Sequence, residues 1–218
     1  QVGEDGSVQG LLNILNIPYT HSGVAASAIA MDKTLSGRLF EVANIQTPPR
    51  LSLNEADNVT PVDYEGPYVI KPRNDGSSVG VEIILDGRVC PRNRWASNCP
   101  LIAERYIAGR ELTVSVLNGN ALCVTEIITN TQFYDYSAKY DVGGSRHILP
   151  AAIPDSCTQK AMSWAERAFE LLGCRGIARA DFRWDEDNDS LYLLELNTQP
   201  GMTKTSLVPE QASFCNLE

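Results

Sequence analysis

Several features that mark particular protein classes are scarce or missing in this sequence. Only two histidines occur, and the six cysteines are scattered without a C-x-x-C pair, which argues against a zinc site. Scattered cysteines fit reduced thiols, so we expect a cytoplasmic protein. No apolar run approaches the roughly 18 residues of a membrane-spanning helix, and no secretion signal opens the sequence. We therefore expect no association with membranes.

Positive charge is also scarce. The 218 residues include 18 lysines and arginines against 27 aspartates and glutamates, which gives a net charge of -9. Such a protein offers no basic surface for nucleic acid, and an anionic substrate would need cations placed locally. With 43% hydrophobic and 21% charged residues, the chain can bury a substantial core and is expected to be globular.

Two common nucleotide-binding motifs are missing as well, because neither G-x-x-x-x-G-K-[ST] nor G-x-G-x-x-G occurs. A different loop lies between two predicted strands in residues 67–84, and its small residues are Gly76, Ser77, Ser78 and Gly80. Backbone N–H groups and hydroxyls of such a loop can bind an anion, and Lys71 at the end of the first strand adds a positive charge. The pattern indicates a phosphate site, with a plain hairpin turn as the alternative.

An acidic hairpin is the second informative stretch. Alternating residues in 178–184 and 191–196 flank a cluster of Asp, Asn and Ser, which is typical of two strands and a turn. If the turn is centred near Asn188, Asp181 lies opposite Glu195, and Asn197 shares the face of Glu195. Facing like charges destabilise a hairpin unless a cation lies between them, and oxygen ligands near a phosphate suit Mg²⁺. The hairpin indicates a magnesium site, with a solvated acidic surface as the alternative.

Helical patterns occur before and between these stretches. Helices are predicted at residues 8–15, 25–30, 31–42 and 155–172. In the first of them, Leu11, Leu12 and Leu15 share one face. Residues 50–66 are polar and are interrupted by Pro61 and Gly66, so we expect a connecting segment there.

The run from Leu101 to Leu117 predicts a short strand, a turn at Gly109 and a longer strand, whose hairpin partner is residues 121–128. Glu104 and Glu111 flank the turn and could hydrogen-bond an adenine and a ribose, or could be two surface glutamates.

Two loops complete the pattern. Residues 133–141 are rich in aromatics and could close over a site with Lys139 and Tyr140 as polar contacts, or form an aromatic-packed surface loop. A glycine-containing loop in residues 198–207 leaves the carboxylate strand within reach of a bound metal ion.

The chain carries, in this order, the motifs G-E-D-G, M-D-K, V-I-K-P with G-S-S-V-G-V, E-R-Y-I-A-G-R-E-L-T-V, F-Y-D-Y-S-A-K-Y, R-A-D-F, and L-E-L-N-T-Q-P-G-M-T with S-L-V-P. This series resembles the D-alanine:D-alanine ligase family of ATP-grasp enzymes over essentially the whole chain. Each motif alone is modest, but their order is very specific.

The resemblance implies an α+β ATP-grasp fold, in which two antiparallel-sheet α/β subdomains clasp ATP. Residues 1–30 would be the remnant of a truncated N-terminal open α/β (pre-ATP-grasp) domain, 31–107 the central subdomain with the glycine-serine loop, and 108–218 the C-terminal subdomain with the metal and second-substrate sites. The implied activity is ATP-dependent ligation of two D-alanines through an acyl phosphate, for peptidoglycan precursors. The family also implies a homodimer of the full-length protein.

The resemblance assigns roles to individual residues. ATP would be bound by Lys33, Lys71, Gly76, Ser78, Glu104, Arg105, Ile107, Glu111 and Lys139. Two Mg²⁺ or Mn²⁺ ions would be held by Asp181, Glu195 and Asn197. The catalytic group would comprise Ser77, Lys139, Tyr140 and Arg179, with Arg179 steadying a developing oxyanion. The D-alanines would contact Ser77, Tyr140, Arg179, Gly201, Ser206 and Leu207.

The resemblance leaves alternatives open. Family members carry, before G-E-D-G, a glutamate that binds the first D-alanine and an H-G pair, and this sequence lacks both, so we expect a fragment. A chain that truly begins at residue 1 would be a catalytically silent ATP-binding module. Tyr140 favours the dipeptide product, because relatives that make D-alanyl-D-lactate usually lack a tyrosine there. A D-lactate or D-serine ligase is the remaining alternative.

Overall fold

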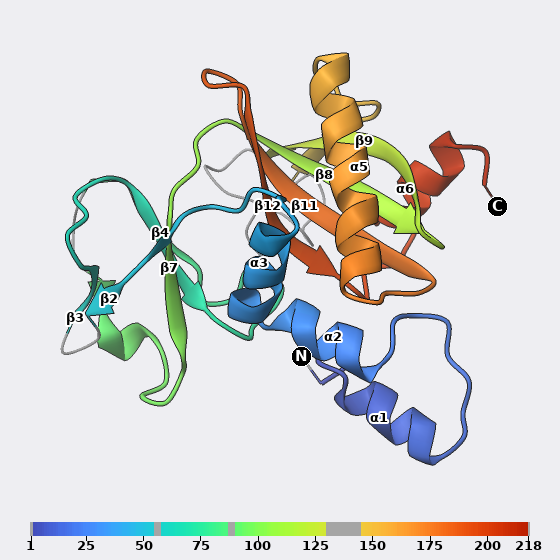
Figure 1. Cartoon of the computed structure of the whole chain (residues 1–218), viewed down its shortest axis with the longest axis horizontal. Coiled ribbons are helices and arrows are strands. Elements are labelled where there is room, and N and C mark those ends of the chain that lie inside the picture. The colour runs from blue at the N-terminus through green and yellow to red at the C-terminus, as the bar shows by residue number, and fades with distance from the viewer. Residues whose placement is uncertain (1, 55–57, 87–89, 130–144, 218) are drawn as a thin grey trace.

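The computed structural model of the chain describes residues 2–54, 58–86, 90–129 and 145–217, which form helices and antiparallel sheets (Figure 1). The helices are α1 (Ser7–Ile14), α2 (Val24–Met31), α3 (Lys33–Val42), α5 (Asp155–Leu171) and α6 (Leu207–Phe214), and η1 (Arg92–Arg94) is a short 3₁₀ turn. The strands are β1 (Arg50–Leu51), β2 (Leu53–Asn54), β3 (Asn58–Pro61), β4 (Tyr68–Pro72), β5 (Glu82–Ile84), β6 (Cys90–Pro91), β7 (Leu101–Arg105), β8 (Arg110–Leu117), β9 (Asn120–Thr129), β10 (Ser145–Ile148), β11 (Ile177–Asp185) and β12 (Ser190–Asn197).

A four-stranded sheet in the order β1-β7-β4-β5 carries the glycine-serine loop between β4 and β5, and a small sheet of β2, β3 and β6 lies beside it. Tyr68 and Ile70 of β4 are buried in a core with Ile84 of β5. The prediction of a plain connecting segment at residues 50–66 was wrong, because β1, β2 and β3 lie there. Strands of two to four residues are too short to show alternation in a sequence.

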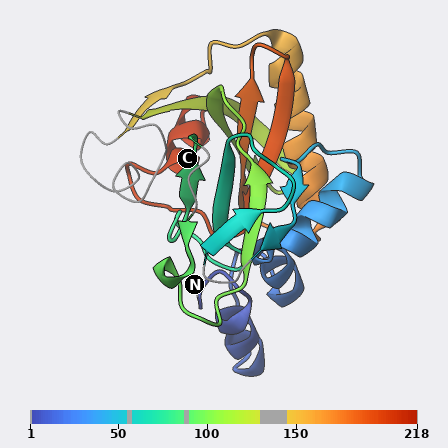
Figure 2. The ribbon, with the colours of Figure 1, turned by 90° about the vertical axis from the view of Figure 1, so that its left-hand side faces the viewer.

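A five-stranded sheet in the order β10-β9-β8-β11-β12 forms the other half of the molecule. The hairpins predicted across Asn118–Asn120 and Asn188 are both present. Helix α5 covers one face of this sheet and α6 lies against the opposite face (Figures 1 and 2). The apolar stripe of α5 is buried, and its members are Ala161, Ala165, Ala168 and Phe169, with Leu172 just after the helix. Helix α3 also packs on this core through Phe40. The division between the central and C-terminal subdomains at residues 107 and 108 remains a prediction.

The start of α3 connects the two sheets. Asp32 caps the helix by accepting hydrogen bonds from the backbone amides of Thr34 and Leu35 at 3.0 and 3.1 Å. Its carboxylate also pairs with Arg73, just after β4, through bonds of 2.8 and 2.5 Å. Burial opposes ionisation of Asp32, but the Arg73 and amide hydrogen bonds outweigh it and hold the pKa of this carboxyl below its usual value. The helix that carries Lys33 is therefore tied to the four-stranded sheet.

Replacing Asp32 should weaken this connection. Asp32→Ala removes both the cap and the ion pair, and we expect the free energy of unfolding to fall by about 1–2 kcal/mol. Asp32→Asn keeps a capping oxygen and should cost less. Because the folded pKa is lowered, the charge stabilises above the unfolded pKa of about 3.9 and loses its effect as pH falls through the folded value. Urea unfolding should show a gap between wild type and Asp32→Asn that narrows in acid; a gap independent of pH would contradict this account.

Helix α1 does not bury the face that its leucines share. Leu11 and Leu15 are 54% and 55% exposed, whereas Gln9 is fully buried and donates to the backbone oxygen of Gly3 at 2.8 Å. Within the described ranges, every helix is too short or too polar to cross a membrane.

Candidate active site

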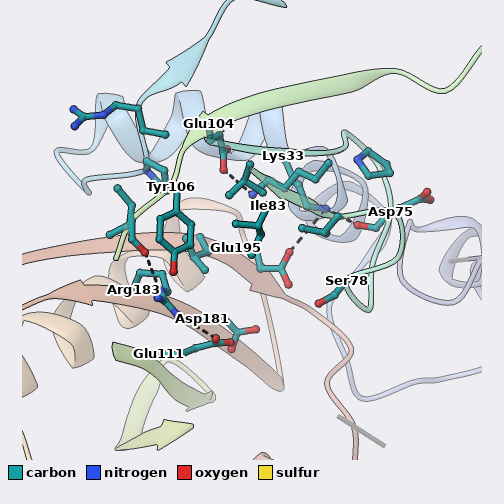
Figure 3. Close-up of a pocket in the computed structure, with 18 of the residues that line it drawn as sticks. Lys33, Asp75, Ser78, Ile83, Glu104, Tyr106, Glu111, Asp181, Arg183 and Glu195 are labelled. Atoms are coloured by element: carbon teal, nitrogen blue, oxygen red, sulfur yellow. Dashed lines mark hydrogen bonds and ion pairs between the residues drawn. The ribbon is translucent and has the colours of Figure 1, made fainter. Parts of the chain in front are cut away.

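A cleft of about 870 Å³ opens between the four-stranded sheet and the β11–β12 hairpin of the five-stranded sheet (Figure 3). The cleft is lined by most of the residues predicted to bind ATP, namely Lys33, Lys71, Ser78, Glu104, Arg105, Ile107 and Glu111, and by two of the predicted metal ligands, Asp181 and Glu195. Labelled side chains from both sheets point toward the space between them (Figure 3). This volume includes space open to the solvent; a lining of apolar side chains with a few polar groups is typical of a site for a small molecule.

Lys71, which is buried, and Lys33, which is partly buried, bring positive charge to this acidic protein at one end of the cleft. Lys71 of β4 is 9% exposed, and its Nζ lies 2.7 Å from Oε2 of Glu104 on the neighbouring strand β7. Lys33, at the first turn of α3, donates to the backbone oxygen of Asp75 at 2.5 Å and lies 3.8 Å from Oε2 of Glu195. Burial lowers the pKa of Lys33, and the charge of Glu195 partly opposes that change. An anion bound here would favour the charged form of Lys33.

The glycine-serine loop borders the lysines and has an unusual backbone. Ser77 and Ser78 have positive φ angles of 54° and 58°, and Gly80 follows at 70°. Left-handed conformations are uncommon for serine and recur at sites that bind ligands. The indole N–H of Trp95 donates to the backbone oxygen of Gly80 at 2.8 Å and anchors the far end of the loop.

The acidic hairpin has the predicted register. Asp181 lies opposite Glu195, and Arg179 lies opposite Asn197, with an irregularity in the pairing just after Asp181. Asp181 is 8% exposed and accepts bonds from Arg179 Nε and Nη2 at 2.8 and 2.6 Å. Thr113 Oγ1 also donates to Asp181 at 2.7 Å. Arg179 and Lys33 thus offset the repulsion between the carboxylates, so that repulsion alone does not require a metal ion.

The donor set nevertheless suits a magnesium ion that is also bound to phosphate. Asp181, Glu195 and Asn197 supply carboxylate and amide oxygens from two paired strands. In the described part of the chain, no three His, Cys, Asp or Glu side chains gather closely enough to hold a metal ion by themselves. Mg²⁺ is commonly held by one or two carboxylates together with substrate phosphates, so these residues fit the group.

The other end of the cleft, away from Lys33 and Asp75, bears Tyr106, Glu111 and Arg183 (Figure 3). Apolar side chains also line the cleft, and the sequence did not single out the lining residues Val69, Val81, Ile83, Tyr106, Arg183 and Leu194. Glu111 lies 3.5 Å from Nη1 of Arg183, whose Nε donates to the backbone oxygen of Ile107 at 3.2 Å. The alternation in β4, with Tyr68 and Ile70 in the core, was the available signal that Val69 faces the cleft with Lys71.

Other predicted residues lie elsewhere. Gly76, Ser77 and Asn197 line a smaller hollow next to the cleft, and Lys33, Asp75 and Glu195 border both. Gly201, Ser206 and Leu207 line neither space: Ser206 precedes α6 and accepts a bond from the Thr203 amide at 3.1 Å, and Leu207 packs against Ile127. Lys139 and Tyr140 lie outside the described residues.

Known proteins resemble this chain in sequence and in fold. A family model described as the D-ala D-ala ligase C-terminus matches residues 54–215. The D-alanine–D-alanine ligase of Ruegeria sp. (strain TM1040) is 51% identical over 219 residues, which cover 99% of this chain and 71% of that protein. The Zymomonas mobilis ligase is 50% identical over 225 residues, covering 99% and 70%. A crystal structure of the Bacillus anthracis D-alanine–D-alanine ligase complexed with ATP matches 99% of this chain and 71% of that one, with a TM-score of 0.78 at 30% identity.

Proposed function

The chain belongs to the D-alanine–D-alanine ligase family, and from this premise we propose how the cleft between its sheets works. The protein has the ATP-grasp fold and is an ATP-dependent ligase that joins two D-alanines to D-alanyl-D-alanine for cell-wall synthesis. The roles of individual residues are our proposal, and the chemical contrast between the two ends of the cleft supports it.

We place the adenine at the end that bears Tyr106 and the triphosphate at the lysine end. A flat base fits beside Val69, Ile83 and Tyr106, where half-buried apolar side chains meet the backbone of Ile107. Glu104 and Glu111 would accept hydrogen bonds from the adenosine, and Arg105 would contact it at the rim. The phosphates would lie against Lys33, Lys71 and the amides of Gly76 and Ser78.

Asp181, Glu195 and Asn197 would hold two Mg²⁺ or Mn²⁺ ions, for which their hard oxygen atoms are suited. When bound, such ions neutralise charge on the transferring phosphoryl group. The protein would contribute the fixed positions of the ligands, because Asp181 and Glu195 belong to paired strands of a sheet.

The reaction follows from two displacements. A carboxylate oxygen of the first D-alanine attacks the γ-phosphorus, the bond to the β-phosphate oxygen breaks, and ADP leaves. The amine of the second D-alanine then attacks the acyl carbon, inorganic phosphate leaves, and the amine loses a proton. Lys33 and Lys71 would hold the phosphates in line, and Arg179 would donate to the oxyanion of the tetrahedral intermediate.

The remaining assignments rest on the family alone. Ser77 and Tyr140 would orient the D-alanines, Lys139 would contact phosphate, and the loop bearing Gly201, Ser206 and Leu207 would line the second-substrate pocket. We also propose, on the same basis, a homodimer in the cytoplasm. A D-lactate or D-serine acceptor, or nucleotide binding without ligation, would contradict the family's activity.

Product analysis with different acceptors separates these outcomes. With ATP, Mg²⁺ and D-alanine, we expect ADP and D-alanyl-D-alanine in equal amounts, and D-lactate or D-serine should not compete when D-alanine is present. The products formed by the intact protein are separated and identified by chromatography. A depsipeptide or a D-alanyl-D-serine product would favour the alternative acceptors, whereas nucleotide binding without D-alanine-dependent ADP would favour the silent module.

A further inference from the structure

The five-stranded sheet has one apolar face and one polar face. On β8, Leu112, Val114 and Val116 belong to the core that packs under α5. Alternation along the strand places Thr113 and Ser115 on the opposite face, toward α6 and the cleft residue Asp181. Both residues are fully buried. A buried hydroxyl normally has a hydrogen-bond partner; Ser115 Oγ has none among the described residues, whereas the partners of the Thr113 hydroxyl identify its role.

Gln211 of α6 packs against this polar face and is fully buried. The pairing of β8 with β9 is irregular between Val114 and Val116, and the backbone amide of Ser115 donates instead to Gln211 Oε1 at 2.8 Å. Gln211 Nε2 donates to the backbone oxygen of Thr113 at 3.2 Å and to Thr125 Oγ1 at 3.0 Å. One side chain thus fixes the irregular part of β8 and its neighbour β9.

Thr113 connects this hydrogen-bond group to the cleft through Asp181. Its hydroxyl lies 2.7 Å from Oδ1 of Asp181 and 3.3 Å from the backbone oxygen of Ala180. Asp181 Oδ1 also accepts from Arg179 Nε at 2.8 Å. The terminal torsion of an aspartate is broad when nothing restrains it. Arg179 Nη2 donates to the other oxygen, Oδ2, at 2.6 Å, so Arg179 and Thr113 together determine the plane of this carboxylate.

We propose that Thr113 is a positioning residue for metal binding: it orients the Asp181 carboxylate, and Gln211 holds Thr113 in place from α6. The inference rests on the proposed role of Asp181 as a metal ligand. Residues that orient metal ligands typically change metal affinity or activity by about 10–100-fold when they are lost. Residues 198–206 connect Asn197 at the end of β12 to α6. Because Gln211 holds α6 against the sheet, it also fixes one end of the loop assigned to the second substrate.

A purely structural role is the competing explanation, because Thr113 also joins β8 to β11 through Ala180. Thr125 provides a matched control. It is a fully buried threonine in the same hydrogen-bond group, and its hydroxyl bonds Gln211. Thr125→Val should therefore disturb packing and hydrogen bonding to a similar degree without removing a bond to Asp181.

The experiment compares Thr113→Val with Thr125→Val in the intact protein. Mn²⁺ binding is followed by electron paramagnetic resonance with a non-hydrolysable ATP analogue present, and unfolding is measured in parallel. We expect Thr113→Val to weaken Mn²⁺ binding by about 10–100-fold, Thr113→Ser to restore it, and Thr125→Val to lower stability while it leaves Mn²⁺ affinity unchanged. Thr113→Ala serves the same purpose if the valine variant does not fold.

Equal Mn²⁺ affinity in wild type and Thr113→Val, or an equal loss in both valine variants, would overturn the inference. If both Thr113 variants fail to fold while Thr125→Val folds, the hydroxyl serves the fold and the positioning role is wrong. A wild-type protein that binds no Mn²⁺ with the nucleotide analogue, or makes no D-alanyl-D-alanine, would instead refute the proposed function on which this inference depends.

Discussion

Glu195→Gln is expected to lower D-alanine-dependent phosphate release by about 10³-fold, because a neutral amide loses several kcal/mol of the charge interaction that holds a metal ion and phosphate. The fold should survive. Glu195 faces Asp181 across the hairpin, so removing one charge relieves repulsion between them. Lys33 loses one partner but keeps its hydrogen bond to the backbone oxygen of Asp75.

Glu186 offers a control for Glu195 on the same hairpin. It lies beyond the end of β11, where its carboxylate is exposed and 3.9 Å from Arg110. Glu186→Gln removes the same charge from the same hairpin away from the cleft, and it should retain wild-type phosphate release. If Glu195→Gln turns over at the wild-type rate, or if both variants lose activity equally, Glu195 does not bind the metal ion.

Lys71→Met is expected to have two separate effects, on activity and on stability. The side chain would no longer contact phosphate, and we expect the rate to fall by about 10²–10³-fold, as for loss of one positioned donor. Glu104 would also be left buried without the ammonium that lies 2.7 Å away. Breaking a buried pair in this way typically costs about 3–5 kcal/mol of stability. Urea unfolding and steady-state phosphate release measure the two effects.

The double variant Lys71→Met with Glu104→Gln separates these effects. It leaves no uncompensated buried charge, so most of the lost stability should return. Replacing a buried ion pair by uncharged side chains often changes the free energy of unfolding only slightly. Activity should not return, because no cation faces the phosphate. Recovery of phosphate release along with stability would mean that Lys71 serves only the fold.

The acidic hairpin shows what the sequence could predict. Two alternating runs around a single turn determine which residues face each other, so a turn centred at Asn188 was enough to pair Asp181 with Glu195. The glycine-serine loop was predictable for a similar reason, because small residues between two strands are a local pattern. Lys33, Arg105 and Ile107 were assigned to ATP from the family resemblance alone.

Features that depend on distant contacts could not be predicted in this way. The burial of Gln211 is determined by an irregular strand pair that lies almost a hundred residues earlier in the chain. The strands β1 to β3 are too short to show a period. The cations beside the carboxylates were also missed: Arg179 shares the strand of Asp181, but Lys33 reaches Glu195 from a helix far earlier in the sequence.

The most direct test of the proposed site is a crystal structure of the protein with Mn²⁺ and a non-hydrolysable ATP analogue, with anomalous scattering used to locate manganese. The account predicts manganese peaks between the phosphates and the side chains of Asp181, Glu195 and Asn197, with the phosphates against Lys33 and Lys71 and the adenine beside Tyr106. Manganese bound away from these three side chains, or a nucleotide outside the cleft, would contradict it.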